Sequence, residues 1–290
     1  MLIVSSIITG LGLGAMYGLL ALGFHVTYAV SKTVNFSQGS SMMLGAVLGY
    51  TFAVTLGWPG PLAVVAALAL CGVFGIIVER FLVRPFADRG SNGWLMSTIA
   101  GGVVLDNLVL FTFGKEPRSL PSPFGPESIS VLGFGVYPLQ LVIPVVGILI
   151  AMLLSFVMWR TRLGKAMQAV VQNAEAARLM GIDTRLVIAA AFAVSTIFAG
   201  IAGLLIAPLF NVSAGMGTIF GIKAFAAAIL GGITSAWGCV IAGMLYGLIE
   251  ALTTAFLGST YTQIVAFTSI IVVLFILPNG LFGRASVSKV

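Results

Sequence analysis

The sequence predicts an all-α, polytopic integral membrane protein with about eight or nine transmembrane helices. Hydrophobic residues make up 59% of the 290-residue chain and charged residues only 8%, whereas soluble domains carry roughly 25% charged residues. The mean hydropathy is +1.14, and apolar runs near the roughly 20 residues that span a bilayer follow one another along the chain. This composition excludes a cytosolic globular enzyme, a disordered chain and a nucleic-acid-binding protein.

Nine apolar segments are expected to form the helices of a single transmembrane domain covering residues 1–290. The first contains no charged residue, and a polar stretch at 31–39 separates it from the second. The segment 219–232 is short, so it could re-enter the membrane rather than cross it. The expected helices are 2–31, a second ending near 56, 62–78, 93–113, 138–159, 184–208, 219–232, 238–257 and 262–277.

The distribution of basic residues predicts how the chain is oriented. With the N-terminus outside and the segments 80–92, 160–185 and 284–290 inside, most of the 14 Lys and Arg residues lie on the cytoplasmic side. Only Lys115 and Arg118 then face the outside, in agreement with the positive-inside rule. We therefore expect the C-terminus to lie in the cytoplasm.

Glycines at four-residue spacing predict close helix packing. Such ridges let two membrane helices approach until their backbones touch. They indicate a tight bundle and carry no information on a substrate. The clearest ridges are Gly10-Gly14-Gly18, Gly45-Gly49, Gly217-Gly221 and Gly243-Gly247.

Three ionisable residues, Asp106, Lys223 and Glu250, lie within predicted spans, where charges are costly and indicate function by default. Lys223 and Glu250 flank a Gly-rich turn, and at a rise of 1.5 Å per residue their depths differ by only about 5 Å. We expect them to form a structural ion pair, because an unpaired buried charge is strongly destabilising. The alternative is that they lie on a solute path. The sequence offers no partner for Asp106.

The polar segment 160–185 is expected to contain an amphipathic helix at 165–180. Gly181 should end this helix, and Asp183 can cap the next one. The apolar side chains recur at the i, i+3, i+4 spacing of one helix face. Because they are small and include no aromatic or Leu anchor, docking into a protein groove is favoured over lying on lipid. They are Met167, Val170, Val171, Ala174 and Ala177.

The sequence lacks the motifs of catalysis and of cofactor binding. It contains no G-x-x-x-x-G-K-[ST] loop for ATP, no G-x-S-x-G or H-E-x-x-H motif, and no spacing of metal ligands. We therefore expect no enzymatic activity, no catalytic or metal site, and no cofactor held by this chain.

Short motifs are spread over nearly the whole chain. They are Asn35-Phe36-Ser37-Gln38-Gly39, Glu79-Arg80 with Arg84-Pro85, Thr161 to Ala169, Glu175 to Asp183, Lys223-Ala224-Phe225 and Leu277 to Gly283. Together they resemble the branched-chain amino-acid type of ABC-importer permease, the smaller of the two permeases that pair. The sequence departs from that pattern at Gln38, where His is common, at Gln168, where Arg is common, at Asp106, where an amide is usual, and at Leu277, where Arg is usual.

The resemblance implies an ABC-importer permease fold in a bacterial inner membrane. The implied partners are a second homologous permease, two cytoplasmic ATPase subunits that bind ATP, and a periplasmic solute-binding protein. Coupling to the ATPases would use the loop at about 160–185, through Glu175, Ala176, Arg178 and Gly181. The intramembrane polar residues that are candidates for the solute path are Asn35, Gln38, Asp106, Asn107, Lys223 and Glu250.

Two kinds of alternative remain open at this point. Branched-chain or related hydrophobic amino acids are the favoured solutes, but similar permeases are associated with urea, short amides and other small organic acids. A stand-alone secondary transporter or channel is the alternative class of protein. Such a protein has no need of an amphipathic cytoplasmic segment, so the segment 160–185 favours an importer driven by partner ATPases.

Overall fold

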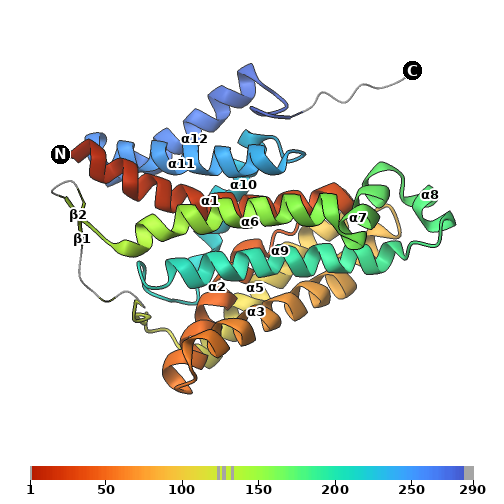
Figure 1. Cartoon of the computed structure of the whole chain (residues 1–290), viewed down its shortest axis with the longest axis horizontal. Helices are drawn as coiled ribbons and strands as arrows, with labels where there is room; N and C mark the ends of the chain where they lie inside the picture. The colour runs from red at the N-terminus through yellow and green to blue at the C-terminus, as the bar shows by residue number, and fades with distance from the viewer. Residues whose placement is uncertain (1, 123–124, 126–128, 132–133, 284–290) are drawn as a thin grey trace.

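Helices make up nearly all of the regular structure in the computed structural model, which describes residues 2–122, 125, 129–131 and 134–283 (Figure 1). Two short strands, β1 (Ile129–Val131) and β2 (Phe134–Val136), form an antiparallel hairpin between α5 and α6. The predicted all-α polytopic fold is confirmed. The helices are α1 (Leu2–Ser31), α2 (Gln38–Tyr50), α3 (Gly60–Ile77), α4 (Arg84–Ala87), α5 (Gly93–Phe113), α6 (Pro138–Arg160), α7 (Arg162–Gln172), α8 (Ala174–Leu179), α9 (Thr184–Ile206), α10 (Met216–Gly231), α11 (Ala236–Leu257) and α12 (Ser259–Ile276).

Seven helical segments of the described chain are long and apolar enough to cross a membrane, and α2 and α10 are shorter. The α2 helix has 13 residues before a π-helical segment, η1 (Thr51–Thr55), continues it, and α10 has 16. Of the nine expected helices, seven are therefore long enough to cross a membrane, and crossing by the two short ones stays a prediction. The residues that lead into α2 are irregular yet buried, as Thr33, Asn35 and Ser37 show. Irregular backbone is tolerated at membrane depth only where protein encloses it in this way.

The centre of the bundle is formed by α1 and α9. In their most apolar stretches, 72% and 61% of the residues are buried, against 17–33% in the other five long segments. In Figure 1, α1 runs the length of the molecule beside α6, with α10 to α12 on one side and α9, α2 and α3 on the other. The N-terminus and the β-hairpin lie at one end of the bundle, and α7 and α8 lie at the opposite end.

The contact between α1 and α11 confirms the packing predicted from the glycine ridges. A Cβ atom added at Gly14 would lie 2.6 Å from the Cα of Met244, and one added at Gly243 or Gly247 would overlap the backbone of α1. Any larger side chain would push the two helices apart, because protein interiors have no free volume to absorb it. This close approach is also what brings Tyr17 of α1 within reach of α11.

The third helix is longer than the sequence suggested. It was expected to end near residue 78, yet it continues through a π-helical segment, η2 (Val78–Val83), into α4, so that one span covers Gly60–Ala87. The backbone N–H of Arg84 bonds to the carbonyl of Glu79, the i→i+5 register of a π-helix. That register stacks the two side chains, and the Arg84 guanidinium donates to both Glu79 carboxylate oxygens at 2.9 and 2.6 Å. Because its charge is neutralised, Glu79 can be buried within a continuing helix.

Breaking this ion pair should destabilise the protein. We expect Glu79→Gln to lower the free energy of unfolding by about 2–3 kcal/mol, because Arg84 would lose a charged hydrogen-bond partner. Arg80→Gln is the matched control, since Arg80 is the exposed neighbour on the same helix. Thermal unfolding of the detergent-purified protein measures both. Equal unfolding midpoints for the two variants would show that the pair does not stabilise the helix.

Candidate functional site

A cavity of about 380 Å³ lies between α1, α2, α5 and α10. Its α10 wall is made by Thr218, Gly221, Ile222 and Phe225, which share one helix face at i, i+3, i+4 and i+7. Three apolar wall residues, Ile99 and Val103 of α5 and Ile222 of α10, are exposed at 40–55%. The cavity therefore opens on the surface of this chain between α5 and α10.

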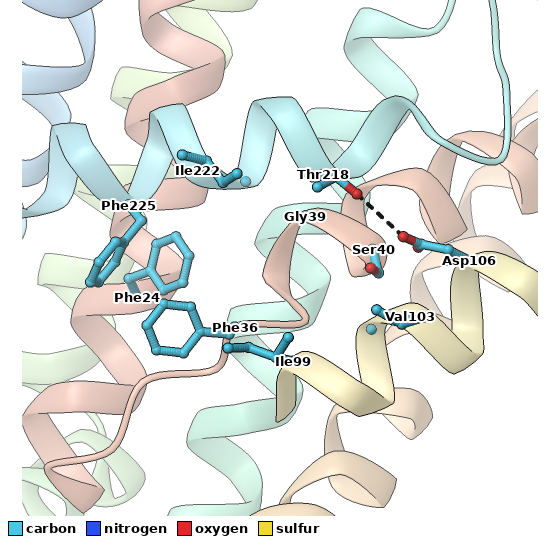
Figure 2. A pocket seen from close by; sticks show the side chains of 12 residues that line it. Phe24, Phe36, Gly39, Ser40, Ile99, Val103, Asp106, Thr218, Ile222 and Phe225 are labelled. Atoms are coloured by element: carbon cyan, nitrogen blue, oxygen red, sulfur yellow. Dashed lines mark hydrogen bonds between the residues drawn. The ribbon is translucent and has the colours of Figure 1, made fainter. Parts of the chain in front are cut away.

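One end of the cavity is polar. Thr218 donates a hydrogen bond to Oδ2 of Asp106 at 3.3 Å, and Ser40 of α2 lies close to the same carboxylate (Figure 2). The close packing of α10 on α2 makes this possible, because Gly39 and Gly217 touch through their backbones. Asp106, which had no partner in the sequence, is thus the only carboxylate among the residues that line the cavity.

The other end of the cavity is aromatic. Phe225 of α10 packs edge-on against Phe36 and Phe24, with ring centroids 5.0 and 5.4 Å apart. Figure 2 shows these three rings on the side away from Asp106. None of the three was a candidate from the sequence, because Phe is abundant throughout the chain. Only the motif residues Phe36 and Phe225 carried a signal that could have singled them out.

Asn35 and Gln38 are buried near the start of α2 and do not line the cavity. The Asn35 Oδ1 atom accepts hydrogen bonds from the backbone and hydroxyl of Ser37, which fixes the turn before the helix. Gln38 donates to the carbonyl of Ser195 at 2.9 Å, and the Ser195 hydroxyl donates back to Gln38 and to the carbonyl of Gly23. These contacts join α2 to α9 and α1.

Asn107 also lies away from the cavity. Although it follows Asp106 directly, it is on the exposed side of α5 and donates to the carbonyl of Val103 at 2.8 Å. Adjacent residues on a helix do not face the same way. The sequence motif that contains both residues therefore contributes only Asp106 to the cavity.

Lys223 and Glu250 form the predicted ion pair, between α10 and α11. Their side chains are only 9% and 12% exposed, and the Tyr17 hydroxyl donates to the second carboxylate oxygen at 2.8 Å. Lys223 lies on α10 but faces α1 and α11, away from the face that lines the cavity. Tyr17 was not anticipated, since a Tyr in a charge-free helix gives no sign of its partner.

The polar segment 160–185 is two helices rather than one. The expected helix at 165–180 is interrupted at Asn173, whose side-chain oxygen accepts from the backbone N–H groups of Glu175 and Ala176 and so begins α8. Asn is a strong helix N-cap, and this competing local bond explains the break. Gly181 ends the segment at φ +84°, and Asp183 caps α9 as predicted.

The apolar face of this segment is only partly free to dock. Of the five predicted stripe residues, Met167, Val170 and Ala177 are buried in a cluster with side chains of α1, α6 and α9 of the same chain, whereas Val171 and Ala174 are exposed. The expectation that the whole stripe enters a groove of a partner is therefore wrong, because three of its five residues are already covered. The most exposed large apolar residues of the segment are Leu179 and Met180, at 88% and 83%, which the sequence pattern did not single out because they lie off the stripe.

The four residues of the proposed coupling motif surround this exposed pair. Glu175 and Ala176 are exposed on α8, and Arg178 is exposed while donating to the Thr184 hydroxyl at 3.3 Å. Gly181, two residues after Leu179, supplies the left-handed turn that a residue with a side chain adopts only with strain. The motif therefore forms a small protruding corner at the end of the bundle where α7 and α8 lie (Figure 1).

Within the described residues, no group of three or more His, Cys, Asp and Glu side chains could hold a metal ion. Cys71 and Cys239 are separate, buried and unpaired with each other. The groups that line the cavity are suited to binding a small molecule. They are one carboxylate, two hydroxyls and three aromatic rings.

A bundle of long apolar helices with a surface cavity that is charged at one end is typical of a multi-pass membrane transport protein. The chain belongs to the family of branched-chain amino acid transport system permease components, whose family model matches residues 6–274. It is a permease subunit of an ABC importer.

Similarity to known proteins extends over almost the whole chain. It is 32% identical over 294 residues to the high-affinity branched-chain amino acid transport system permease protein LivH of Escherichia coli, covering 97% of this chain and 96% of LivH. It is also 32% identical to BraD of Pseudomonas aeruginosa, covering 98% and 97%. A chain in the solved structure of PsaBC from Streptococcus pneumoniae in complex with Fab aligns with a TM-score of 0.50 at 11% identity, over 93% of this chain and 91% of that one, a likeness of fold alone.

Removing either partner of the Lys223–Glu250 pair should destabilise the protein. We expect Lys223→Met or Glu250→Gln alone to cost about 3–5 kcal/mol, because each leaves one buried charge uncompensated. The double variant should recover part of this loss. Unfolding of the purified variants in a double-mutant cycle measures the coupling, and strictly additive losses would mean that the two residues act separately.

Proposed function

We propose that this chain is the membrane subunit through which an ATP-driven importer moves branched-chain amino acids. The observation that carries the proposal is the 32% identity to LivH and BraD over nearly their whole length, since both relatives are named as permeases for these solutes. The shape of the cavity supports it, because aromatic rings at one end suit an apolar side chain. The whole of 1–290 would act as one permease domain.

A second homologous permease is the proposed partner that would cover the open side of the cavity. The cavity lies at the surface between α5 and α10, so this chain alone does not enclose a path. Large apolar side chains such as Met96 and Phe111 extend from α5, at 71% and 86% exposure. A partner permease covering this face would complete the wall, and a periplasmic solute-binding protein would deliver the solute.

Two cytoplasmic ATPase subunits are the proposed source of energy, and they would bind the ATP because this sequence contains no P-loop motif. The corner formed by Glu175, Ala176, Arg178 and Gly181 carries the exposed pair Leu179 and Met180. Apolar side chains fixed on a short helix are suited to fill a pocket on a partner. Movement of the ATPases would pull this corner and shift the permease between outward-open and inward-open states.

Docking of the ATPases should depend on the exposed pair. We expect Leu179→Ser with Met180→Ser to remove most of the co-purifying ATPase and most of the solute uptake without loss of folded permease, since both side chains contact little of this chain. Ala176→Trp and Gly181→Val should act similarly, by bulk and by strain in the turn. Affinity purification of the complex and uptake into vesicles are the measurements.

Leu56→Ser is the matched control for these variants, because Leu56 is 54% exposed and follows η1, away from the α7–α8 corner. It should leave ATPase association unchanged. Full ATPase binding and full uptake by the variants at residues 176, 179, 180 and 181 would contradict the coupling role of this corner.

The chain should sit in the inner membrane of a bacterium with α7, α8 and the C-terminus in the cytoplasm; residues 284–290 lie outside the described part. We expect Ser259→Cys to react with a membrane-impermeant thiol reagent in intact cells and Ser91→Cys to react only after permeabilisation. Both side chains are exposed, whereas the native Cys71 and Cys239 are fully buried. Labelling of Ser91→Cys in intact cells would contradict the predicted orientation of the chain.

The solute is decided by the binding protein as well as by the permease. Titration of the cognate solute-binding protein with leucine, isoleucine and valine, and in parallel with urea, short amides and small organic acids, separates the proposed solutes from the alternatives. Tight binding of urea alone would leave the proposed importer function in place and would replace branched-chain amino acids by urea as the solute.

A further inference from the structure

The cavity contains a carboxylate that this chain leaves without a counter-ion. The ion pairs among the described residues are Glu79–Arg84, Asp88–Arg185 and Glu250–Lys223. Asp106 belongs to none of them. Thr218 donates to its Oδ2 atom and Ser40 also interacts with the carboxylate, whereas the buried Oδ1 atom has no hydrogen-bond partner among the described residues. Because a carboxylate within a membrane span is costly without a cation, Asp106 is suited to a cation that another molecule supplies.

The opposite end of the cavity restricts what that molecule is. Phe24, Phe36 and Phe225 form an edge-on cluster there, on three different segments of the chain. Figure 2 shows Asp106 and the rings at opposite ends of the cavity. A metal ion or a small hydrated cation would gain nothing from the rings, whereas an organic cation with an apolar tail would contact both ends.

The first turn of α2 adds a third feature. Gly39 and Ser40 line the cavity directly after α2 begins at Gln38. Ser37 makes no side-chain capping bond to this helix and donates to Asn35 at 2.6 Å instead. The N-terminus of a helix carries partial positive charge, and membrane helices that begin within the bilayer present this end to anionic groups of solutes.

We propose that the cavity binds a zwitterionic amino acid with a hydrophobic side chain and that Asp106 recognises its ammonium group. The α-carboxylate then faces the first turn of α2, and the side chain faces the three Phe rings. The volume of about 380 Å³ lies within the roughly 300–1,000 Å³ of small-molecule sites. This inference rests on the proposed import function and names the residue that selects amines over neutral amides and over organic acids.

Binding of L-leucine to the complete transporter in nanodiscs, without its solute-binding protein, tests the assignment. We expect Asp106→Asn to weaken equilibrium binding of radiolabelled leucine roughly tenfold to a hundredfold, the range for losing a charged hydrogen bond. Asp106→Glu should retain part of the affinity. Thr112→Val is the matched control, because Thr112 lies on the exposed side of α5 and bonds only to its own helix.

Two analogues of leucine identify the group that Asp106 contacts. Isopentylamine keeps the ammonium and lacks the carboxylate, and 4-methylpentanoate keeps the carboxylate and lacks the ammonium. Isopentylamine should compete with leucine in the wild-type complex and lose this ability in Asp106→Asn, whereas competition by 4-methylpentanoate should not weaken.

Three results would overturn the assignment. They are unchanged leucine affinity and competitor ranking in Asp106→Asn, absence of leucine binding to the intact wild-type complex, and dissociation of the second permease from the Asp106→Asn complex. The last result would identify a cation of the partner permease as the counter-ion. ATPase co-purification and uptake by the wild type are recorded in the same preparation, so failure of the importer function is distinguished from failure at Asp106.

Discussion

A lipid bilayer offers neither water nor counter-ions, so every charge and every stretch of irregular backbone within it must be enclosed by protein. In this structure α1 provides most of that enclosure. Its glycine ridge lets α11 approach to backbone contact, and its Tyr17 hydroxyl bonds to Glu250 of the ion pair. Further along, Phe24 forms part of the cavity, and His25 Nδ1 lies 2.8 Å from the carbonyl of Ile233 in the turn between α10 and α11. The burial of α1 follows from these contacts.

The same constraint explains where the helices depart from regular geometry. The third span becomes π-helical where Glu79 must meet Arg84, five residues later. The second helix begins only at Gln38, after an irregular stretch whose polar groups bond to Ser37, Thr98 and Ser195. Non-helical backbone at membrane depth is tolerated where it is enclosed or lines a cavity, and this stretch ends at the cavity wall. The irregularities therefore coincide with the polar contacts that the protein needs.

The α9 helix connects the corner formed by α7 and α8 to the start of α2. Asp183 caps the first turn of α9 directly after the corner that ends at Gly181. Ser195, midway along α9, bonds both to Gln38 at the start of α2 and to the carbonyl of Gly23 in α1. These hydrogen bonds form a continuous physical connection between the corner and the helix that begins at the cavity.

The sequence alone determined the class of protein, because hydropathy, basic-residue bias and glycine spacing act locally and need no partner. It also predicted the Lys223–Glu250 pair, since two charges at similar depth in adjacent spans can neutralise each other, and the structure confirmed that pair. Only the tertiary structure decided which side chains share the cavity. Asp106 enters it whereas Asn107, Asn35 and Gln38 do not, and the Phe24, Phe36 and Phe225 rings converge from three segments. It also decided that Met167, Val170 and Ala177 of the predicted stripe are covered while Leu179 and Met180 are exposed. Helix periodicity predicts which residues share a face. The element that covers this face comes from elsewhere in the chain, so which element it is depends on how the whole bundle packs.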